Sequence, residues 1–178
     1  MNPQRSNHHV LRHPAFRGLL GVGTVYFIGN AMQVMAAAWL MVEITGSPFL
    51  AALVQTAVFL PMFVLSLPAG VLADTTDRRR LMRIALLLQA LTVATLAGLL
   101  LIGWAGPTSL LLFTGIAGCC TALLSPAWNT TVADSIPREE LPQAIVAVSI
   151  AYNVARALGP SMAGFVFASL WLGLYVGT

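Results

Sequence analysis

The sequence LADTTDRRRL, at residues 72–81, decides the fold of this chain. It places two acids and three arginines between long apolar segments, in a protein of 178 residues that is 58% hydrophobic and only 8% charged. Arginines hold short loops on the cytoplasmic side of a membrane, so this charged break is typical of a turn between two membrane-spanning helices. The sequence therefore predicts a protein of the lipid bilayer.

The apolar segments on either side of this break are longer than one membrane crossing requires. Residues 18–42, 44–73 and 84–133 carry no charged side chain, over 25, 30 and 50 residues respectively. About 20 helical residues are enough to cross the hydrocarbon core. Residues 1–16 are expected to form a tail and residues 17–178 a transmembrane domain, with approximate spans at 17–42, 48–73, 81–102, 108–136 and 141–174.

The spans are expected to be helical. Backbone amides in lipid must be hydrogen-bonded within a helix or a closed barrel. Barrel strands alternate apolar and polar residues over about 10 positions, and these segments do not. The predicted fold class is therefore all-α, a polytopic membrane protein with about five transmembrane helices.

The arginines predict which side of the membrane each connection faces. The turns around Glu43 and Trp104 contain no arginine, whereas cytoplasmic loops carry the excess of positive charge. The N-terminus and the 72–81 break are therefore expected in the cytoplasm, for a multi-pass protein of a bacterial inner membrane. Eight of the nine basic residues agree: Arg5, Arg12, Arg17, Arg78, Arg79, Arg80, Arg83 and Arg138.

Enzymes and nucleic-acid-binding proteins fit this sequence poorly. The net charge is +3, but the arginines follow membrane topology and form no basic groove, so no nucleic-acid partner is expected. No Gly-rich phosphate loop follows a strand, and all three histidines lie in the tail, which leaves no Ser/His/Asp set. Cys119 and Cys120 adjoin in an apolar run without a nearby histidine, which favours packing over metal binding. We expect no catalytic site, cofactor or metal.

Polar residues recur at helical spacing within three of the spans, which a simple anchor does not need. A single Thr or Ser is most simply explained by interhelical hydrogen bonding in a packed bundle. Three aligned stripes favour a water-accessible cavity. The candidate lining residues are Tyr26, Asn30 and Gln33 in span one and Thr121, Ser125 and Asn129, with Thr114 and Gly118, in span four; Ser149, Asn153, Arg156 and Pro160 form the stripe of span five.

Two local patterns resemble the major facilitator superfamily. Residues 70–80, GVLADTTDRRR, are similar to the loop between helices two and three of that superfamily. In that pattern a glycine and an acid are separated by three residues, and basic residues follow. Thr75 stands where the pattern usually has a basic residue, and Asp77 stands where it usually has a glycine. The branch of siderophore and macrolide exporters commonly has Asp at the position of Asp77. Residues 155–164, ARALGPSMAG, resemble the Gly-Pro antiporter motif of helix five. Flanking segments also look like that branch: Trp39-Leu40, Thr45-Gly46-Ser47-Pro48, Pro126-Ala127-Trp128-Asn129 and Pro137-Arg138-Glu139-Glu140-Leu141.

The resemblance covers nearly the whole chain and implies the N-terminal part of a six-helix half-bundle. A full member has two such halves around a site at the membrane midplane, so a C-terminal half-bundle is expected as the missing partner. The resemblance also implies a gating loop made of Gly70, Asp74, Asp77, Arg78, Arg79 and Arg80, and a helix-five motif of Asn153, Arg156, Gly159, Pro160 and Gly164. Each set also has a simpler explanation. The arginines of the loop could serve only to keep it in the cytoplasm, and the helix-five motif could serve only ordinary helix packing.

Arg156 is the basic residue that topology does not explain. It lies 15 residues beyond Leu141, about 22 Å along a helix at about 1.5 Å per residue. An arginine at such depth requires water or a partner, while all six acids of the chain lie at span ends or in connections. The expected partner is an anionic substrate group or an acid of the missing half. A structural contact with carbonyls freed near Pro160 is the alternative.

The resemblance implies transmembrane export of a small molecule, such as a drug, macrolide or siderophore, coupled to protons. The expected partners are the lipid bilayer, the small-molecule substrate and the missing half-bundle. The alternative is a non-transporting membrane assembly or regulatory subunit, or an inactive truncated gene product.

Overall fold

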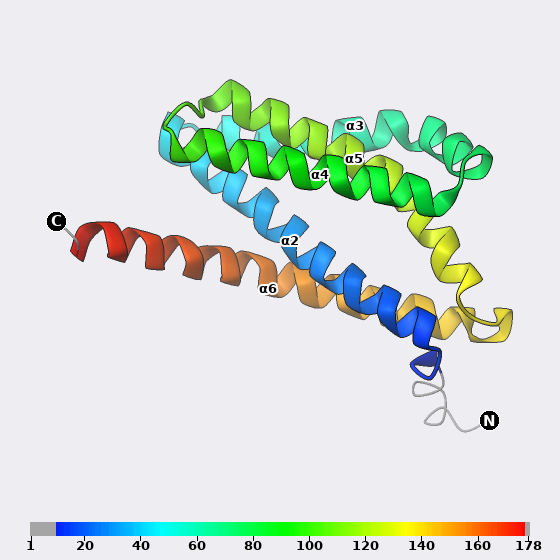
Figure 1. The fold of residues 1–178 in the computed structure, drawn as a ribbon. Coiled ribbons are helices and arrows are strands. Elements are labelled where there is room, and N and C mark those ends of the chain that lie inside the picture. Colours follow the sequence, from blue (N-terminus) through cyan, green and yellow to red (C-terminus); the bar gives the residue numbers. More distant parts are fainter. Residues whose placement is uncertain (1–9, 177–178) are drawn as a thin grey trace. The chain divides into compact units, whose positions relative to one another are not determined.

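The computed structural model describes residues 10–176, with side chains through 169 except Phe167. In this part of the chain the main elements are five long helices, and a short 3-10 turn precedes the last (Figure 1). This arrangement confirms the all-α prediction. The elements are α2 (Pro14–Thr45), α3 (Pro48–Thr75), α4 (Arg78–Leu101), α5 (Pro107–Asp134), η2 (Arg138–Glu140) and α6 (Leu141–Val176).

The ends of the helices differ from the predicted spans by a few residues. Helix α2 begins at Pro14, inside the predicted tail, because proline is well suited to a first helical turn, where its missing N–H is not needed. Helix α5 ends at Asp134, two residues before the predicted end, since Pro137 disfavours helical geometry at Ile136. Arg5, His8 and His9 of the predicted tail lie outside the described residues.

All five long helices are long and apolar enough to cross a membrane. Their outward faces are also apolar, as α3 illustrates: Phe63 is 80% and Leu67 83% exposed. Large apolar side chains at such exposure are stable in lipid and unfavourable in water. The structure therefore describes a multi-pass membrane protein.

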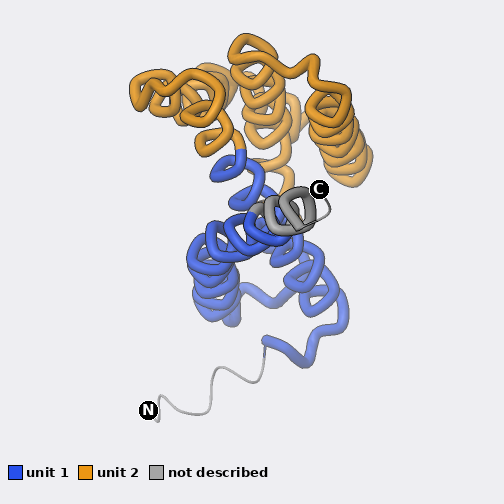
Figure 2. The backbone as a smooth tube through the Cα atoms, turned by 90° about the vertical axis from the view of Figure 1, so that its left-hand side faces the viewer, with its two compact units in different colours: residues 1–36, 132–178 blue, residues 37–131 orange. Residues whose placement is uncertain are grey.

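The chain divides into two compact units, and each is described by itself (Figure 2). Unit 1 comprises residues 1–36 and 132–178, and unit 2 comprises residues 37–131. The long helices α2 and α5 each contribute to both units.

Unit 2 is built from α3, α4 and the adjoining parts of α2 and α5. Its core contains Met41, Val54 and Leu110, which are at most 1% exposed. Helices α3 and α5 approach closely at Gly118, where an added Cβ would lie 2.7 Å from the carbonyl oxygen of Val58. A small residue at this point lets two helix backbones meet.

Unit 1 contains α6 and the first part of α2. Gly159 of α6 lies against α2, where an added Cβ would be 2.6 Å from Cβ of Ala31 and 3.2 Å from the amide nitrogen of Met32. Ala155 and Ala163 lie four residues to either side of Gly159 on the same helix face, and both are buried. Small side chains along this face of α6 thus permit close packing on α2.

Candidate functional site

The loop between α3 and α4 is organised by Asp77. Its Oδ1 accepts hydrogen bonds from the backbone amides of Arg79 at 2.8 Å and Arg80 at 3.2 Å. These bonds make Asp77 the N-cap of α4, where a carboxylate satisfies amides that the helix leaves without partners. The bonds from Arg80 and then Arg79, with a smaller contribution from the charges of Arg83 and Arg79, hold the pKa of Asp77 below its ordinary value.

Asp74 has a different environment in the same loop. It lies in the last turn of α3, its side chain is exposed, and it forms no ion pair or hydrogen bond with another described residue. A negative charge at a helix C-terminus is unfavourable for the helix dipole. The stability of α3 therefore does not explain an acid at this position.

The other residues of the predicted gating loop are arranged around these two acids. Arg79 and Arg80 are exposed, and Arg78 is half-buried. The Nε of Arg83 donates to the carbonyl oxygen of Arg79 at 3.2 Å. A Cβ added to Gly70 would meet nothing within 4 Å, so close packing within the described chain does not require glycine here.

The predicted cavity-lining residues fall in both units. In unit 1, Tyr26, Asn30 and Gln33 of α2 are half-buried. In unit 2, the hydroxyl of Thr121 donates to the carbonyl of Ala117 at 3.0 Å, and that of Ser125 to the carbonyl of Thr121 at 2.8 Å. These bonds run within α5 and do not link it to another helix. Asn129 is exposed, whereas Thr114 is fully buried and Gly118 packs on α3.

The helix-five motif places Arg156 beside an aromatic residue that the sequence did not single out. The guanidinium carbon of Arg156 lies 5.8 Å from the centroid of the Tyr152 ring. That ring is in turn met by Phe27 of α2, with centroids 5.4 Å apart and planes at 89°. The spacing of four residues between Tyr152 and Arg156 was the available signal, because such residues are neighbours on a helix surface.

The remaining motif residues of α6 have separate environments. The amide nitrogen Nδ2 of Asn153 donates to the carbonyl of Ser149 at 2.8 Å. Gly159 permits the close approach to α2 described above, and Pro160 follows it inside the helix. A Cβ added to Gly164 would meet nothing within 4 Å.

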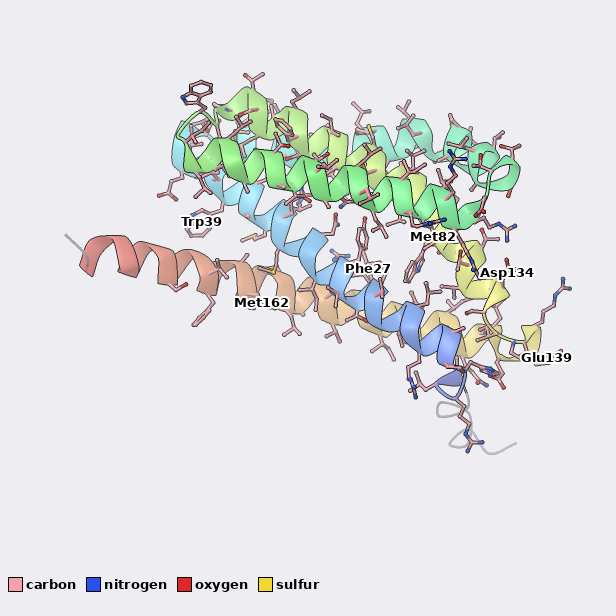
Figure 3. All side chains as sticks on the ribbon, viewed as in Figure 1. Phe27, Trp39, Met82, Asp134, Glu139 and Met162 are labelled. Carbon is pink, nitrogen blue, oxygen red and sulfur yellow. The ribbon has the colours of Figure 1, made fainter. Side chains whose placement is uncertain are left out.

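A contact between distant parts of the sequence joins the residue just before α2 to the last residue of η2, in unit 1. Nε2 of His13 lies 3.1 Å from Oε2 of Glu140. Figure 3 labels the neighbouring Glu139, at the same end of unit 1 as the start of α2. The two partners are 127 residues apart in sequence, so no local pattern could have predicted the pair.

The same end of unit 1 contains a largely apolar cavity of about 310 Å³. Its polar lining is limited to Thr24 and Gln143, and the side-chain oxygen of Gln143 is buried without a hydrogen-bond partner. None of the residues predicted to line a cavity borders this one. The apolar lining includes Val10, Leu11, Leu20, Val146 and Ile150.

Known proteins resemble this chain over most of its length. Residues 5–175 match the family model described as transmembrane secretion effector. The chain is 30% identical over 148 residues to the multidrug efflux pump Tap of Mycolicibacterium fortuitum. The aligned region covers 80% of this chain and 36% of the pump. The chain is 27% identical to the staphyloferrin A transporter of Staphylococcus aureus, covering 80% and 36%, and 26% identical to the uncharacterized MFS-type transporter YfiS of Bacillus subtilis, covering 89% and 39%.

The chain thus spans well under half the length of these relatives. No solved structure matches it at a significant level. The family match extends over nearly all of the chain, including the loop after α3 and the helix-five motif in α6 described above. Together with the five apolar helices, it shows that the chain belongs to the transmembrane secretion effector family of the major facilitator superfamily.

Proposed function

We propose that the protein exports a small molecule across a bacterial inner membrane in exchange for protons. The observation that carries the proposal is the family match over residues 5–175. Similarity to a multidrug efflux pump and to a siderophore transporter supports a small organic substrate. The chain itself is the N-terminal part of the transporter in this proposal, and a second half-bundle completes the substrate pathway.

The loop after α3 serves as the gate on the cytoplasmic side. Asp77 is occupied in capping α4, and Asp74 is available to contact another element in one conformation of a rocking bundle. This division explains why the loop contains two acids three residues apart. Gly70, Arg78, Arg79 and Arg80 complete the gate.

Polar residues of α2, α5 and α6 face the substrate pathway in this proposal. They are Tyr26, Asn30 and Gln33 of α2, Thr121, Ser125 and Asn129 of α5, and Asn153 and Arg156 of α6. Gly159, Pro160 and Gly164 let α6 pack and bend as the bundle changes conformation. Hydroxyls that bond within their own helix remain able to accept a second hydrogen bond from a substrate.

Accumulation measurements on the full-length gene product test this proposal. The gene is expressed in bacteria that lack their main efflux pumps, and retention of a macrolide, ethidium and a carboxylate siderophore is measured. Expression should lower retention of at least one compound, and collapse of the proton gradient should restore it. Unchanged retention of all three, with the protein present in the membrane, would favour the non-transporting subunit instead.

A further inference from the structure

Arg156 is a charged side chain inside a segment long and apolar enough to span the membrane, and no acid of the described residues pairs with it. It lies in α6 within the segment able to span the bilayer, 15 residues beyond the first residue of that helix. Its side chain is exposed, and none of the described carboxylates forms an ion pair with it. A guanidinium in this position is stabilised by water, by an aromatic ring or by an anion that arrives from outside the chain.

Tyr152 supplies the aromatic ring and leaves the hydrogen-bonding capacity of Arg156 unused. The guanidinium carbon lies 5.8 Å from the ring centroid, within the range of a cation–π contact. Arg156 donates no hydrogen bond to another residue of the described chain. Its five N–H donors are therefore available in the fork geometry that matches two carboxylate oxygens.

The ring under Arg156 is held in place from the neighbouring helix. Phe27 of α2 meets Tyr152 edge to face, with centroids 5.4 Å apart, and α2 approaches α6 closely at Gly159. The Tyr152 hydroxyl has no hydrogen-bond partner among the described residues, and the side chain is 44% exposed. The cluster thus combines a positioned cation with accessible aromatic surface.

We infer that Arg156, supported by Tyr152, binds the carboxylate of an amphipathic organic anion whose apolar part lies against the two aromatic rings. The inference rests on the proposed function, because transport brings such a molecule to a membrane-embedded site. A carboxylate matches the guanidinium fork in two hydrogen bonds. The apolar part of the ligand is desolvated on the surface of Tyr152 and Phe27.

Equilibrium binding to the purified full-length protein tests this site without requiring transport. The probes share one fluorophore and differ in charge: dansylglycine is an anion, its methyl ester is neutral, and dansylcholine is a cation. The variants are Arg156→Gln, Arg156→Lys, Tyr152→Leu and Tyr152→Phe. Arg138→Gln is the matched control, because it removes one arginine charge from the exposed η2 turn outside the long helices.

The parent should bind dansylglycine more tightly than its ester. Arg156→Gln should weaken dansylglycine binding about tenfold, the size expected for a charge-assisted pair, and leave the ester within about twofold. Arg156→Lys should be intermediate because it keeps the charge and loses the fork. Tyr152→Leu should weaken the binding of dansylglycine, because it removes the aromatic ring. Tyr152→Phe keeps the ring and should bind dansylglycine like the parent. Arg138→Gln should bind all three probes like the parent.

Three results would overturn the inference: no preference of the parent for the acid, no loss of acid binding in Arg156→Gln, or an equal loss for all three probes. The last would assign Arg156 a structural role. If Arg156→Gln does not fold, Arg156→Lys provides the same comparison of acid and ester. If the protein binds dansylglycine through Arg156 but transports no compound, the proposed export is contradicted and the carboxylate site is not. If it transports compounds but does not prefer the acid to the ester, the carboxylate site is contradicted and export is not.

Discussion

At the scale of single residues, the loop after α3 places two nearby acids in different environments. Asp77 accepts two amide hydrogen bonds at the start of α4, and Asp74 accepts none within the described chain. The difference follows from position, because only a residue just before a helix can satisfy its first amides. Within this charged motif, Asp77 thus has a folding role, and we propose that Asp74 acts in the gate.

Replacing Asp77 should separate its capping role from its charge. Asp77→Ala should increase hydrogen exchange at the amides of Arg79 and Arg80, whereas Asp77→Asn should keep most of their protection, since Asn is also a good N-cap. Exchange measured by mass spectrometry on the first turn of α4 tests this. Equal exchange in Asp77→Ala and the parent would contradict the cap.

The cap should also respond to acid. The pKa of Asp77 is lowered in the folded protein, so the carboxylate stabilises the fold above its unfolded pKa. That contribution decreases as the pH falls through the lower folded value. Protection of the first turn of α4 should therefore be constant from neutral pH to mildly acidic pH and decline only below the ordinary Asp range. Asp77→Asn, which cannot titrate, serves as the control and should show no such decline.

Replacing Asp74 should affect transport more than folding. Asp74→Asn in the full-length protein should reduce efflux while leaving expression and thermal stability near those of the parent. Loss of a charge-assisted contact formed in one conformation should shift the conformational balance by about 1 to 3 kcal/mol. Asp77→Asn is the matched control, with the same chemical change three residues away. Normal efflux by well-expressed Asp74→Asn protein would remove Asp74 from the gate.

At the scale of helices, glycines matter where they meet another backbone and not wherever a family motif places them. Gly159 and Gly118 each face a neighbouring helix at distances that exclude a Cβ, while Gly164 and Gly70 meet nothing within 4 Å. The motif around Gly159 therefore includes at least one position fixed by packing within unit 1. The structure assigns no such constraint to Gly164.

Alanine substitutions should distinguish these positions. Gly159→Ala should destabilise the protein by about 1 to 3 kcal/mol through overpacking, and Gly164→Ala should be close to neutral. The nearest atom to the new methyl group at 159 is Cβ of Ala31, so adding Ala31→Gly should recover part of the loss. At Gly118 the nearest atoms belong to the backbone of Val58. Shortening the Val58 side chain by Val58→Ala should therefore not restore the stability lost in Gly118→Ala. Thermal unfolding in detergent measures all five variants, and equal stability of the two single variants at 159 and 164 would contradict the packing account.

The sequence predicts helices better than it predicts contacts between them. Long apolar runs located all five helices, and Pro14, Asp77 and Pro137 explain where particular ends fall. The contact of Phe27 with Tyr152 and that of His13 with Glu140 join residues more than a hundred positions apart. Such pairs depend on how α2 and α6 pack, which periodicity within one helix does not specify. The Arg156–Tyr152 contact lies within a single helix, and only its four-residue spacing was visible in advance.

At the scale of the whole molecule, the arginines predict one orientation in the membrane. The N-terminus and residues 74–80 should face the cytoplasm, and residues 43–48 and 103–107 the opposite side, because only the first two regions contain arginine. Alkaline phosphatase, which is active only outside the cytoplasm, should be inactive when fused after Thr76 and active when fused after Gly106. The reverse pattern would invert the topology.

Transport by the purified full-length protein tests the central claim most directly. The protein is reconstituted in liposomes with an imposed proton gradient, and movement of the compound whose retention it lowers in cells is followed over time. We expect saturable uptake that requires the gradient, decreases in Asp74→Asn and persists in Asp77→Asn. The absence of gradient-driven movement in liposomes that contain folded, correctly inserted protein would contradict the assignment as a proton-coupled exporter.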